Sequence, residues 1–393
     1  MQVNTPLLMQ NFIRYNPTKV IFGRNVIDQI CDEISPYGNK ALILIGKDSV
    51  KKSGLYARLV SLLNICGIEH RTYEGIKSNP IYQDADAAVT QAKSFNADMV
   101  IALGGGSVID TAKAVAMGFY VDHSTWDFYL QKSKPERALP IITILTLAAT
   151  GTEMNPFTVL QDTENGSKRG YGHPLLHPKV SYLDPSFTTT VPADYTAYGV
   201  SDLIAHCLEQ FFGSGNAPLT DLHTAAVIRL AITYGLKVKD QPEDYDTRAN
   251  IMWLATNALN GSLTAGKNSG DWACHGFEHS LSVLFDIAHG AGLSIVFPAW
   301  LKYHQDKIAT KLAFLAKQVF DIDTDNEIDD AKAFIYHLEH FYQQINTPIR
   351  LNEVNIGPSS KTAILDNFIL NKVNGQVYKL TEEDHEAILN LMW

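Results

Sequence analysis

Short apolar runs alternate with amphipathic stretches along the first half of the chain. The apolar runs are rich in branched residues and lie at 41–46, 98–106 and 139–146, with a weaker one at 70–75. The amphipathic stretches carry apolar side chains at helical spacing and lie at 49–66, 80–96 and 107–117. Continuous apolar strands separated by helices predict a parallel sheet that is covered by helices on both faces.

The pattern changes around residues 184–192, where the strand-like runs end. Beyond this point the apolar side chains recur at helical spacing over long stretches, at 193–212, 219–236 and 329–345. Few branched runs bounded by turns follow. The chain is therefore expected to form an α/β domain over residues 1–190 and an all-helical domain over residues 191–393.

Composition and charge narrow the class of protein. The chain has 393 residues, of which 46% are hydrophobic and 19% charged, as in ordinary globular proteins. A net charge of −10 argues against nucleic acid or an anionic membrane as a partner. The N-terminus lacks the pattern of a signal peptide, and the longest apolar stretch, residues 138–150, is too short to cross a bilayer.

The four cysteines, Cys31, Cys66, Cys207 and Cys274, show no CxxC spacing, and we expect a cytoplasmic protein. Cys207 and Cys274 stand next to histidines that are candidate metal ligands. Neighbours on a helix point about 100° apart, so one member of each pair reaches a metal only at the expense of the other. Both cysteines are interpreted as small buried residues that fill space.

Histidines gather between residues 271 and 290. His275 and His279 are four residues apart and would project from one face of a helix. His289 lies fourteen residues beyond His275, roughly 21 Å along a straight helix, whereas metal–nitrogen bonds are about 2 Å long. If His289 serves the same centre, the chain must turn first, and Asp286 and the glycines that follow His289 favour such a turn.

Asp202 and His206 form a second pair with the same spacing of four. One carboxylate and several imidazoles on converging helices suit a catalytic divalent metal with an open coordination position. The competing interpretation is that these histidines are spaced by chance. The residues alone also leave open which of the three histidines in the first group would bind a metal.

A glycine-rich turn, Gly104-Gly105-Gly106-Ser107, stands where a buried strand meets a helix. The glycines let the backbone approach a ligand closely, and the free N–H groups of a helix N-terminus attract an anion. Ser107 is expected to be the N-cap, with Asp110 at the third helical position. Ile109 occupies the place of the third glycine in the usual dinucleotide motif, so the turn alone is weak evidence.

A second tight turn, from Gly46 to Ser49, follows the first strand. Both turns stand at the carboxyl ends of strands, which is the edge where open α/β sheets bind ligands. The two turns together therefore favour a nucleotide site more strongly than either turn does alone.

Three motifs in fixed order resemble the iron-containing (group III) alcohol dehydrogenases. They are GGGSVIDTAKAVA, YGVSDLIAH and the HGFEH…HG segment, and the resemblance extends from about residue 10 to residue 375. The segments IGKDSVKKSGLY, LNGSLTAGK and DWACHGFEHSLS are most similar to the butanol dehydrogenase and broad-range aldehyde reductase branch. The resemblance implies a dehydroquinate synthase-like fold: a Rossmann-like domain, a helical domain and a cleft between them for nicotinamide and metal.

The resemblance also assigns roles to single residues. It implies that the metal ligands are Asp202, His206, His275 and His289. It implies that His279 faces the nicotinamide instead of binding metal, and there His279 is a candidate proton relay. A ligand set made up only of nitrogen and oxygen atoms, without a thiolate, fits Fe²⁺, Zn²⁺ or Mn²⁺.

The cofactor residues implied by the resemblance lie in the α/β half. The phosphate loop is Gly104, Gly105, Gly106 and Ser107, and the other cofactor contacts are Gly46, Lys47, Ser49, Asp110, Thr146, Thr150 and Lys168. Thr146, Thr150, Gly151 and Glu153 match a threonine- and glycine-rich family turn, in which Leu147 and Ala149 replace the usual Thr and Gly.

The expected enzyme is a metal-dependent alcohol dehydrogenase or aldehyde reductase that acts on small aliphatic substrates such as butanol and butanal, without contact to nucleic acid or membrane. Trp272 and Phe277, which flank His275, favour an apolar substrate. Lys47 and Ser49 favour NADP(H), with NAD(H) as the alternative, since NAD enzymes usually place an acid near the ribose. Homodimers are usual for the family.

Two other functions remain open at this point. The first is a polyol dehydrogenase or a dehydroquinate-synthase-like lyase on the same fold. The second is a metal-dependent hydrolase, which would act without nicotinamide.

Overall fold

The computed structural model describes residues 8–393, and the chain forms two compact units. The α/β unit consists of Asn16–Thr196 and Gln241–Thr256. The helical unit consists of residues 8–15, Ala197–Asp240 and Asn257–Trp393. The predicted single cut after residue 190 would assign residues 8–15, 191–196 and 241–256 to the other unit than their contacts do.

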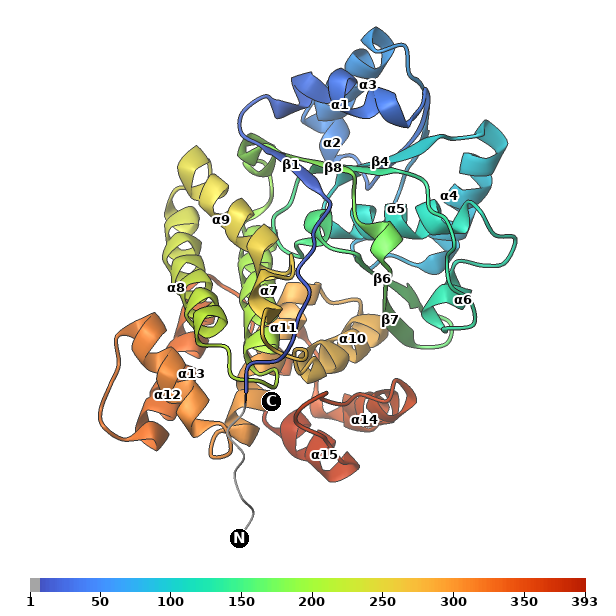
Figure 1. Ribbon diagram of the computed structural model, residues 1–393. Helices are drawn as coiled ribbons and strands as arrows, with labels where there is room; N and C mark the ends of the chain where they lie inside the picture. Colours follow the sequence, from blue (N-terminus) through green and yellow to red (C-terminus); the bar gives the residue numbers. More distant parts are fainter. Residues whose placement is uncertain (1–7) are drawn as a thin grey trace. The chain divides into compact units, whose positions relative to one another are not determined.

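The α/β unit is built on a six-stranded sheet in the order β1-β8-β5-β4-β2-β3 (Figure 1). Its strands are β1 (Lys19–Phe22), β2 (Lys40–Ile45), β3 (Glu69–Tyr73), β4 (Met99–Gly104), β5 (Ile141–Leu145) and β8 (Val180–Leu183). Every neighbouring pair in this sheet is parallel. The predicted parallel sheet is confirmed.

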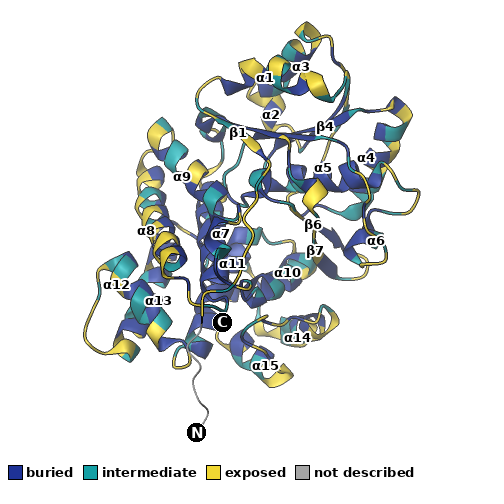
Figure 2. Ribbon diagram, in the orientation of Figure 1, coloured by how far each residue is buried: buried dark blue, intermediate teal, exposed yellow. Residues whose placement is uncertain are grey.

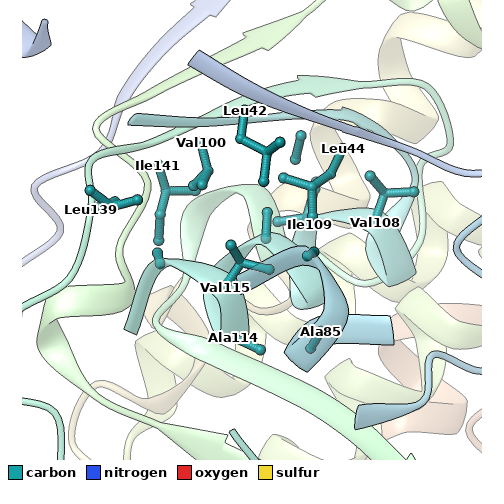
Figure 3. Packing of buried hydrophobic residues seen from close by; sticks show 14 of the residues in the cluster. Leu42, Leu44, Ala85, Val100, Val108, Ile109, Ala114, Val115, Leu139 and Ile141 are labelled. Atoms are coloured by element: carbon teal, nitrogen blue, oxygen red, sulfur yellow. The ribbon is translucent and has the colours of Figure 1, made fainter. Parts of the chain in front are cut away.

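Alternate side chains of the central strands supply two separate cores, because successive residues of a strand point to opposite faces. Leu42, Leu44 and Val100 pack against α4 (Tyr82–Phe95) and α5 (Gly106–Gly118), as Figure 3 shows in part. Their sequence neighbours face the other core, which includes Ala41, Ile43, Ile101 and residues of α1 (Ile30–Ile34) and α3 (Leu55–Ile65). Each fully buried branched side chain contributes about 1.5–3 kcal/mol, which explains why both faces are apolar.

Several elements of the α/β unit differ from the sequence prediction. The helix predicted over residues 49–66 is split into α2 (Ser49–Lys52) and α3, because Gly54 has a φ of 79° that interrupts the helix. The edge strand β1 and the strand β8 were missed, since each has only four residues. The hairpin of β6 (Phe157–Asp162) and β7 (Ser167–Gly172) was also missed. The short α6 (Trp126–Tyr129) packs against β7.

The helical unit contains most of the helices that follow residue 190. They are α7 (Ala193–Phe211), α8 (Pro218–Asp240), α10 (Ala273–Phe285), α11 (His289–His304), α12 (Ala309–Phe320), α13 (Glu327–Gln344), α14 (Lys361–Leu370) and α15 (Glu382–Asn390). The first four residues of α7, and most of α9 (Tyr245–Ala258), belong to the α/β unit. Helix α11 is buried along nearly its whole length (Figure 2). Among residues 8–393, no helix combines the length and the apolar character that crossing a membrane requires.

The four cysteines fall into two classes. Cys31 in α1 and Cys66, just after α3, form a disulfide that the sequence analysis did not predict. Cys207 and Cys274 are free and buried, as expected for residues that fill space.

Candidate metal centre and phosphate loop

The four predicted metal ligands and His279 lie on three helices of the helical unit. Asp202 and His206 are one turn apart on α7, His275 and His279 are one turn apart on α10, and His289 is the first residue of α11. Helix α10 ends at Phe285, and Asp286 adopts a left-handed φ of 51° that redirects the chain. The turn that the sequence required between His279 and His289 is confirmed.

Four of these side chains converge. The Oδ1 atom of Asp202 lies 3.5 Å from Nδ1 of His206 and 3.7 Å from Nε2 of His289. The ring centroids of His206 and His275 are 4.9 Å apart, and those of His275 and His289 are 5.3 Å apart. Asp202, His275 and His289 each offer one ligand atom, and these atoms all lie within 4.8 Å of one another. The arrangement gathers one carboxylate and two imidazoles around one point, with the imidazole of His206 directly beside them.

Three polar atoms at this point are buried without a hydrogen-bond partner: Oδ1 of Asp202, Nδ1 of His206 and Nε2 of His275. An unsatisfied buried polar group costs roughly 1–3 kcal/mol, so such a cluster needs a ligand to compensate it. Burial lowers the pKa of His206 to about 3, although Asp202 opposes this shift. The low pKa keeps the imidazole of His206 neutral and able to donate a lone pair. Oxygen and nitrogen donors of this kind fit a divalent metal such as Fe²⁺ or Zn²⁺.

His279 lies at the side of this cluster. Its ring centroid is 5.8 Å from that of His289 and 6.5 Å from that of His275. Glu278, His279 and His289 form a second group whose ligand atoms lie within 4.8 Å of one another. The geometry of the described residues alone is therefore compatible with His279 inside or outside the coordination sphere.

Two buried carboxylates beside the cluster escaped the sequence analysis. Glu209 on α7 accepts a hydrogen bond from Nδ1 of His275, and Glu278 on α10 contacts Nδ1 of His289. One signal was available for the first: Asp202, His206 and Glu209 are spaced i, i+4, i+7 and so share one face of α7.

Trp272 and Phe277, from which the apolar substrate was predicted, lie in different surroundings. The Trp272 ring is 5.2 Å from that of His275 and 6.4 Å from that of His206. Phe277 is fully buried and packs edge-on against Phe368 of α14 at 4.8 Å. Phe277 therefore belongs to the core of the helical unit, and its use as a flanking pocket residue was wrong.

In the α/β unit, the glycine turn joins β4 to α5 as predicted, but its capping differs. Helix α5 begins at Gly106, its N-cap is Gly105, and no side chain caps it. Ser107 is already the second helical residue, and its hydroxyl donates to the carbonyl of Ser78. The prediction of Ser107 as N-cap was wrong, because the helix starts earlier than its polar side chains suggest.

The glycine turn has the close packing of a phosphate-binding loop. A Cβ atom on Gly106 would lie 2.7 Å from the Thr150 side chain, and one on Gly105 would lie 3.2 Å from Leu147. Only glycine fits at Gly106, because any larger side chain would collide with Thr150. A helix N-terminus without a side-chain cap suits a pyrophosphate, so these residues fit a dinucleotide cofactor.

The other predicted cofactor residues of this region lie around the loop. The Thr146 N–H donates to the carbonyl of Gly104, and the Thr150 hydroxyl accepts from the Thr152 N–H. The Asp110 carboxylate accepts from the Thr152 hydroxyl and from the Val159 N–H. Lys168 on β7 is buried, and its Nζ donates to Oδ1 of Asn79 at 3.2 Å.

Lys113 is a buried cation that sequence analysis missed. Five oxygen atoms of Thr152, Asn155 and Phe157 lie 2.6–3.3 Å from its Nζ and share its three N–H donors. Burial lowers the pKa of Lys113 to about 8, and Asp110 and Glu153 oppose this shift. The lysine therefore ties α5 to the turn that packs on Gly106.

Gly46, Lys47 and Ser49 lie after β2, at the same carboxyl edge of the sheet. The Gly46 carbonyl accepts from the N–H of Gly75, whereas Lys47 and Ser49 are exposed. Asp48 between them is the N-cap residue of α2 and is exposed too.

Comparison with known proteins decides the family. The model "Iron-containing alcohol dehydrogenase" matches residues 17–185, and the model "Fe-containing alcohol dehydrogenase family, C-terminal" matches residues 196–393. The chain belongs to the iron-containing alcohol dehydrogenase family. The resemblance found in the sequence is confirmed.

Relatives within this family are similar over nearly the whole chain. Probable NADH-dependent butanol dehydrogenase 1 of Bacillus subtilis (strain 168) is 38% identical, covering 97% of this chain and 99% of the relative. NADPH-dependent aldehyde reductase YqhD of Escherichia coli (strain K12) is 32% identical, covering 91% and 92%. The crystal structure of NADH-dependent butanol dehydrogenase A from Thermotoga maritima, 39% identical, superposes with a TM-score of 0.95 over 98% of this chain and 99% of that chain.

Membership in the iron-containing alcohol dehydrogenase family makes the chain an oxidoreductase of the alcohol dehydrogenase or aldehyde reductase type. It also implies a nicotinamide cofactor and an iron-type divalent metal. The hydrolase considered from the residues alone is thereby set aside.

Proposed function

We propose that this enzyme interconverts small aliphatic aldehydes and alcohols with NADP(H), using a divalent metal held by Asp202, His206, His275 and His289. The observation that carries the proposal is the convergence of unpartnered buried atoms of Asp202, His206 and His275, with His289 at 3.7 Å from Asp202. The butanol dehydrogenases and the aldehyde reductase among its relatives support the substrate class.

Each group has a separate chemical task. When bound, the metal acts as a Lewis acid on the substrate oxygen, and the nicotinamide exchanges hydride with the carbon that bears it. The Asp202 carboxylate and the three imidazoles hold the metal as neutral or anionic donors. The His279 imidazole exchanges a proton with the substrate oxygen, donating it in aldehyde reduction and accepting it in alcohol oxidation.

The phosphate loop supplies the cofactor site. The backbone N–H groups of Gly105, Gly106 and Ser107 at the start of α5 bind the pyrophosphate. Thr146, Thr150 and Lys168 complete the proposed cofactor site. Both oxygens of Asp110 accept hydrogen bonds from neighbouring residues, and we assign it the role of holding this loop in place.

Trp272 now carries the argument for small apolar substrates. Its ring lies 5.2 Å from His275 and offers an apolar surface beside the cluster. An apolar pocket discriminates by about 1–3 kcal/mol per methylene, so we expect activity on aldehydes of several chain lengths. A polyol dehydrogenase on the same fold is the competing function.

The proposed reaction is tested by following the absorbance of reduced cofactor with butanal, with and without a chelator. We expect oxidation of the cofactor that stops in the chelator and returns when Fe²⁺ or Zn²⁺ is added. In the alcohol direction, kcat/KM for butanol should exceed that for glycerol. Turnover that resists complete metal removal, or a preference for glycerol, would contradict the proposal.

The preference for NADPH rests on the turn after β2. Lys47 is exposed there and can pair with a 2′-phosphate, and Ser49 can donate a hydrogen bond to it. Four relatives at 36–38% identity carry names that specify NADH, whereas YqhD carries one that specifies NADPH. The turn itself, with lysine where an acid is usual for NAD, supports NADPH.

We predict that kcat/KM for NADPH exceeds that for NADH, and that Lys47→Asp lowers this ratio at least tenfold. The reason is the loss of a charge-assisted contact and the gain of a repulsive one, together worth more than about 1.4 kcal/mol. Lys52→Asp is the matched control, since Lys52 is an exposed lysine at the end of the short helix α2 that follows Lys47. A wild-type ratio below one, or an equal response in both variants, would refute the assignment.

We further propose that the enzyme is a cytoplasmic homodimer. The resemblance to the family supports the homodimer, since homodimers are usual for it, and the cytoplasmic location follows the expectation from the cysteine spacing. The Cys31–Cys66 disulfide argues against a cytoplasmic location, since disulfides are rare in reducing compartments. Sedimentation analysis of the purified chain tests the dimer, and thiol counting in rapidly denatured cells tests the redox state.

A further inference from the structure

We propose that Glu209 and Glu278 are positioning residues that fix the tautomer and orientation of His275 and His289 for metal binding. Each glutamate is buried beside the cluster, and each meets the Nδ1 atom of one histidine. The inference rests on the proposed function, because it takes His275 and His289 as ligands. It concerns two residues outside the predicted ligand set.

Glu209 connects α7 to the start of α10. Its side chain is 2% exposed, and its Oε1 accepts from Nδ1 of His275 at 2.9 Å. The same oxygen accepts from the backbone N–H of His275, and Oε2 accepts from that of Trp272 at 2.5 Å. The carboxylate thus receives donors from the first turn of α10 and from the imidazole that this turn carries.

Glu278 plays the corresponding part between α10 and α11. Its side chain is completely buried, its Oε2 contacts Nδ1 of His289, and its Oε1 accepts from the Ser282 hydroxyl. The opposite nitrogen of His289, Nε2, is the one that lies 3.7 Å from Asp202. One end of the imidazole therefore meets a carboxylate and the other end faces the proposed metal.

The chemistry of imidazole explains the consequence. When Nδ1–H donates to a carboxylate, the lone pair must reside on Nε2, and the ring cannot rotate without breaking that bond. In His275 the Nε2 atom is the buried one without a partner, as this arrangement requires. A carboxylate on the far nitrogen also makes the ligand more basic and so strengthens the bond to the metal.

His206 lacks this device and provides the internal contrast. Its unpartnered nitrogen is Nδ1, which faces Asp202 at 3.5 Å. The two buried glutamates therefore orient the two histidines of the α10–α11 segment. The relative position of Asp202 and His206 is instead fixed by their spacing of one turn on α7.

The burial of both glutamates indicates a role beyond local structure. Burying a carboxylate is costly unless donors or a cation compensate it. Asp202, Glu209 and Glu278 bring three acidic groups into one buried cluster of histidines. A bound divalent cation would compensate this charge, so the glutamates raise metal affinity by electrostatics as well as by orientation.

The test is the metal dissociation constant of the purified full chain, measured with Zn²⁺ against a competing chelator at constant pH. We expect Glu209→Gln and Glu278→Gln each to weaken Zn²⁺ binding 10- to 100-fold. The metal-free proteins are compared by thermal unfolding, so that a variant that fails to fold is recognised. Glu209→Asp and Glu278→Asp, which keep the charge, should recover part of the affinity.

Asp271→Asn is the matched control. Asp271 is a buried carboxylate just before α10 that accepts from the backbone N–H groups of Val377 and Tyr378. Its loss should lower the unfolding temperature of the metal-free protein while leaving the Zn²⁺ dissociation constant within about twofold of wild type. A merely structural role for the glutamates would instead make all three amide variants alike in affinity.

The outcomes separate this inference from the proposed function. If the wild type binds Zn²⁺ and the glutamine variants bind it equally well, the positioning role is refuted and the metal centre stands. Complete loss of Zn²⁺ in Glu278→Gln, with folding intact, would make Glu278 a ligand and also refute the role proposed here. A wild type that binds no Zn²⁺, Fe²⁺ or Co²⁺ would overturn the proposed function itself.

Discussion

Asp202 is the residue on which the metal centre depends most directly. Its Oδ1 atom lies 3.5 Å from Nδ1 of His206 and 3.7 Å from Nε2 of His289, yet it is buried without a hydrogen-bond partner. A carboxylate in this position lowers the repulsion between a cation and its surroundings and shares its charge with the imidazole ligands. Its removal leaves three neutral nitrogens with much less attraction for a divalent ion.

We predict that Asp202→Ala and His275→Ala each abolish metal binding and turnover. A site with four ligands loses most of its affinity with any one of them. Metal analysis of the purified variants, together with the rate of butanal reduction, measures both effects. Full occupancy with a normal rate in either variant would remove that residue from the ligand set.

His279→Ala should give a different result. We expect it to retain metal at the wild-type level while kcat falls by about 10²- to 10⁴-fold, the usual contribution of a proton donor. The readouts are metal content and the pH profile of kcat, which should lose one of its limbs. Purification of the variant without metal would place His279 among the ligands.

At the residue scale, the spacing of residues in the sequence predicted which side chains share one face of a helix. The pairs Asp202/His206 and His275/His279 were recognisable because four residues make one helical turn. The choice between His279 and His289 came from the family resemblance, since spacing alone allows both. Glu209 and Glu278 were invisible as positioning residues, because a buried acid and a surface acid look alike until their partners are known.

The turn between α10 and α11 was the element predicted best. The sequence demanded a change of direction before His289, and Asp286 provides it with a left-handed conformation. The start of α5 was predicted less well, because Ser107 resembles an N-cap although the helix begins one residue earlier at Gly106. A capping residue is recognised from the local sequence, whereas the start of this helix also depends on Thr150, which packs against Gly106 from a later turn.

The contacts of α5 with the turn after β5 depend on Lys113. We predict that Lys113→Met lowers the free energy of unfolding by about 3–5 kcal/mol, the range for a buried ion that leaves its partners unpaired. Five oxygen acceptors lose their shared donor. The dissociation constant for NADPH should rise as well, because Thr150 would no longer be held against Gly106.

Denaturant unfolding and NADPH fluorescence titration measure these two effects. Lys93→Met serves as the control, since the Lys93 ammonium also donates to a carbonyl, that of Val121, but is partly exposed. It should cost less than about 1 kcal/mol. Equal losses in the two variants would show that burial of Lys113 adds nothing to the phosphate loop.

For the whole molecule, the buried histidine His304 contributes to the pH dependence of the free energy of unfolding. His304, at the end of α11, packs 4.6 Å from Trp300, and burial together with Lys307 lowers its pKa to about 4 against the effect of Asp384. The unfolded chain binds this proton near pH 6.5, so it carries more protons than the folded chain between about pH 4 and 6.5. Stability therefore falls as the pH drops through this window and levels off below it.

We predict that His304→Phe reduces the loss of unfolding free energy between pH 7 and pH 5 by on the order of 1–2 kcal/mol. Phenylalanine keeps an aromatic ring beside Trp300 but does not titrate. His340→Phe, at an exposed position of α13, is the control and should leave the pH dependence unchanged. An acid sensitivity identical in the wild type and His304→Phe would mean that His304 is protonated without cost in the folded state.

The arrangement of segments in the two units was the feature hardest to foresee. Periodicity gives each element its type, and the apolar runs of β2, β4 and β5 gave the parallel sheet. Periodicity does not say which unit a helix joins, and the sequence analysis identified no element over the residues of α9. Contacts decide this, such as the Phe22 and Trp253 rings at 6.0 Å and the Arg24 guanidinium over the Tyr245 ring at 3.5 Å.

The interleaving of the units bears on the order in which the protein matures during synthesis. The α/β unit lacks α9, and with it Met252 of its core, until residue 256 has left the ribosome. By then α7 and α8 have already been synthesised, although α10 to α15 of the helical unit have not. The nascent chain therefore cannot finish its first unit before beginning its second, and a chain that ends near residue 196 has a sheet whose hydrophobic core still lacks Met252.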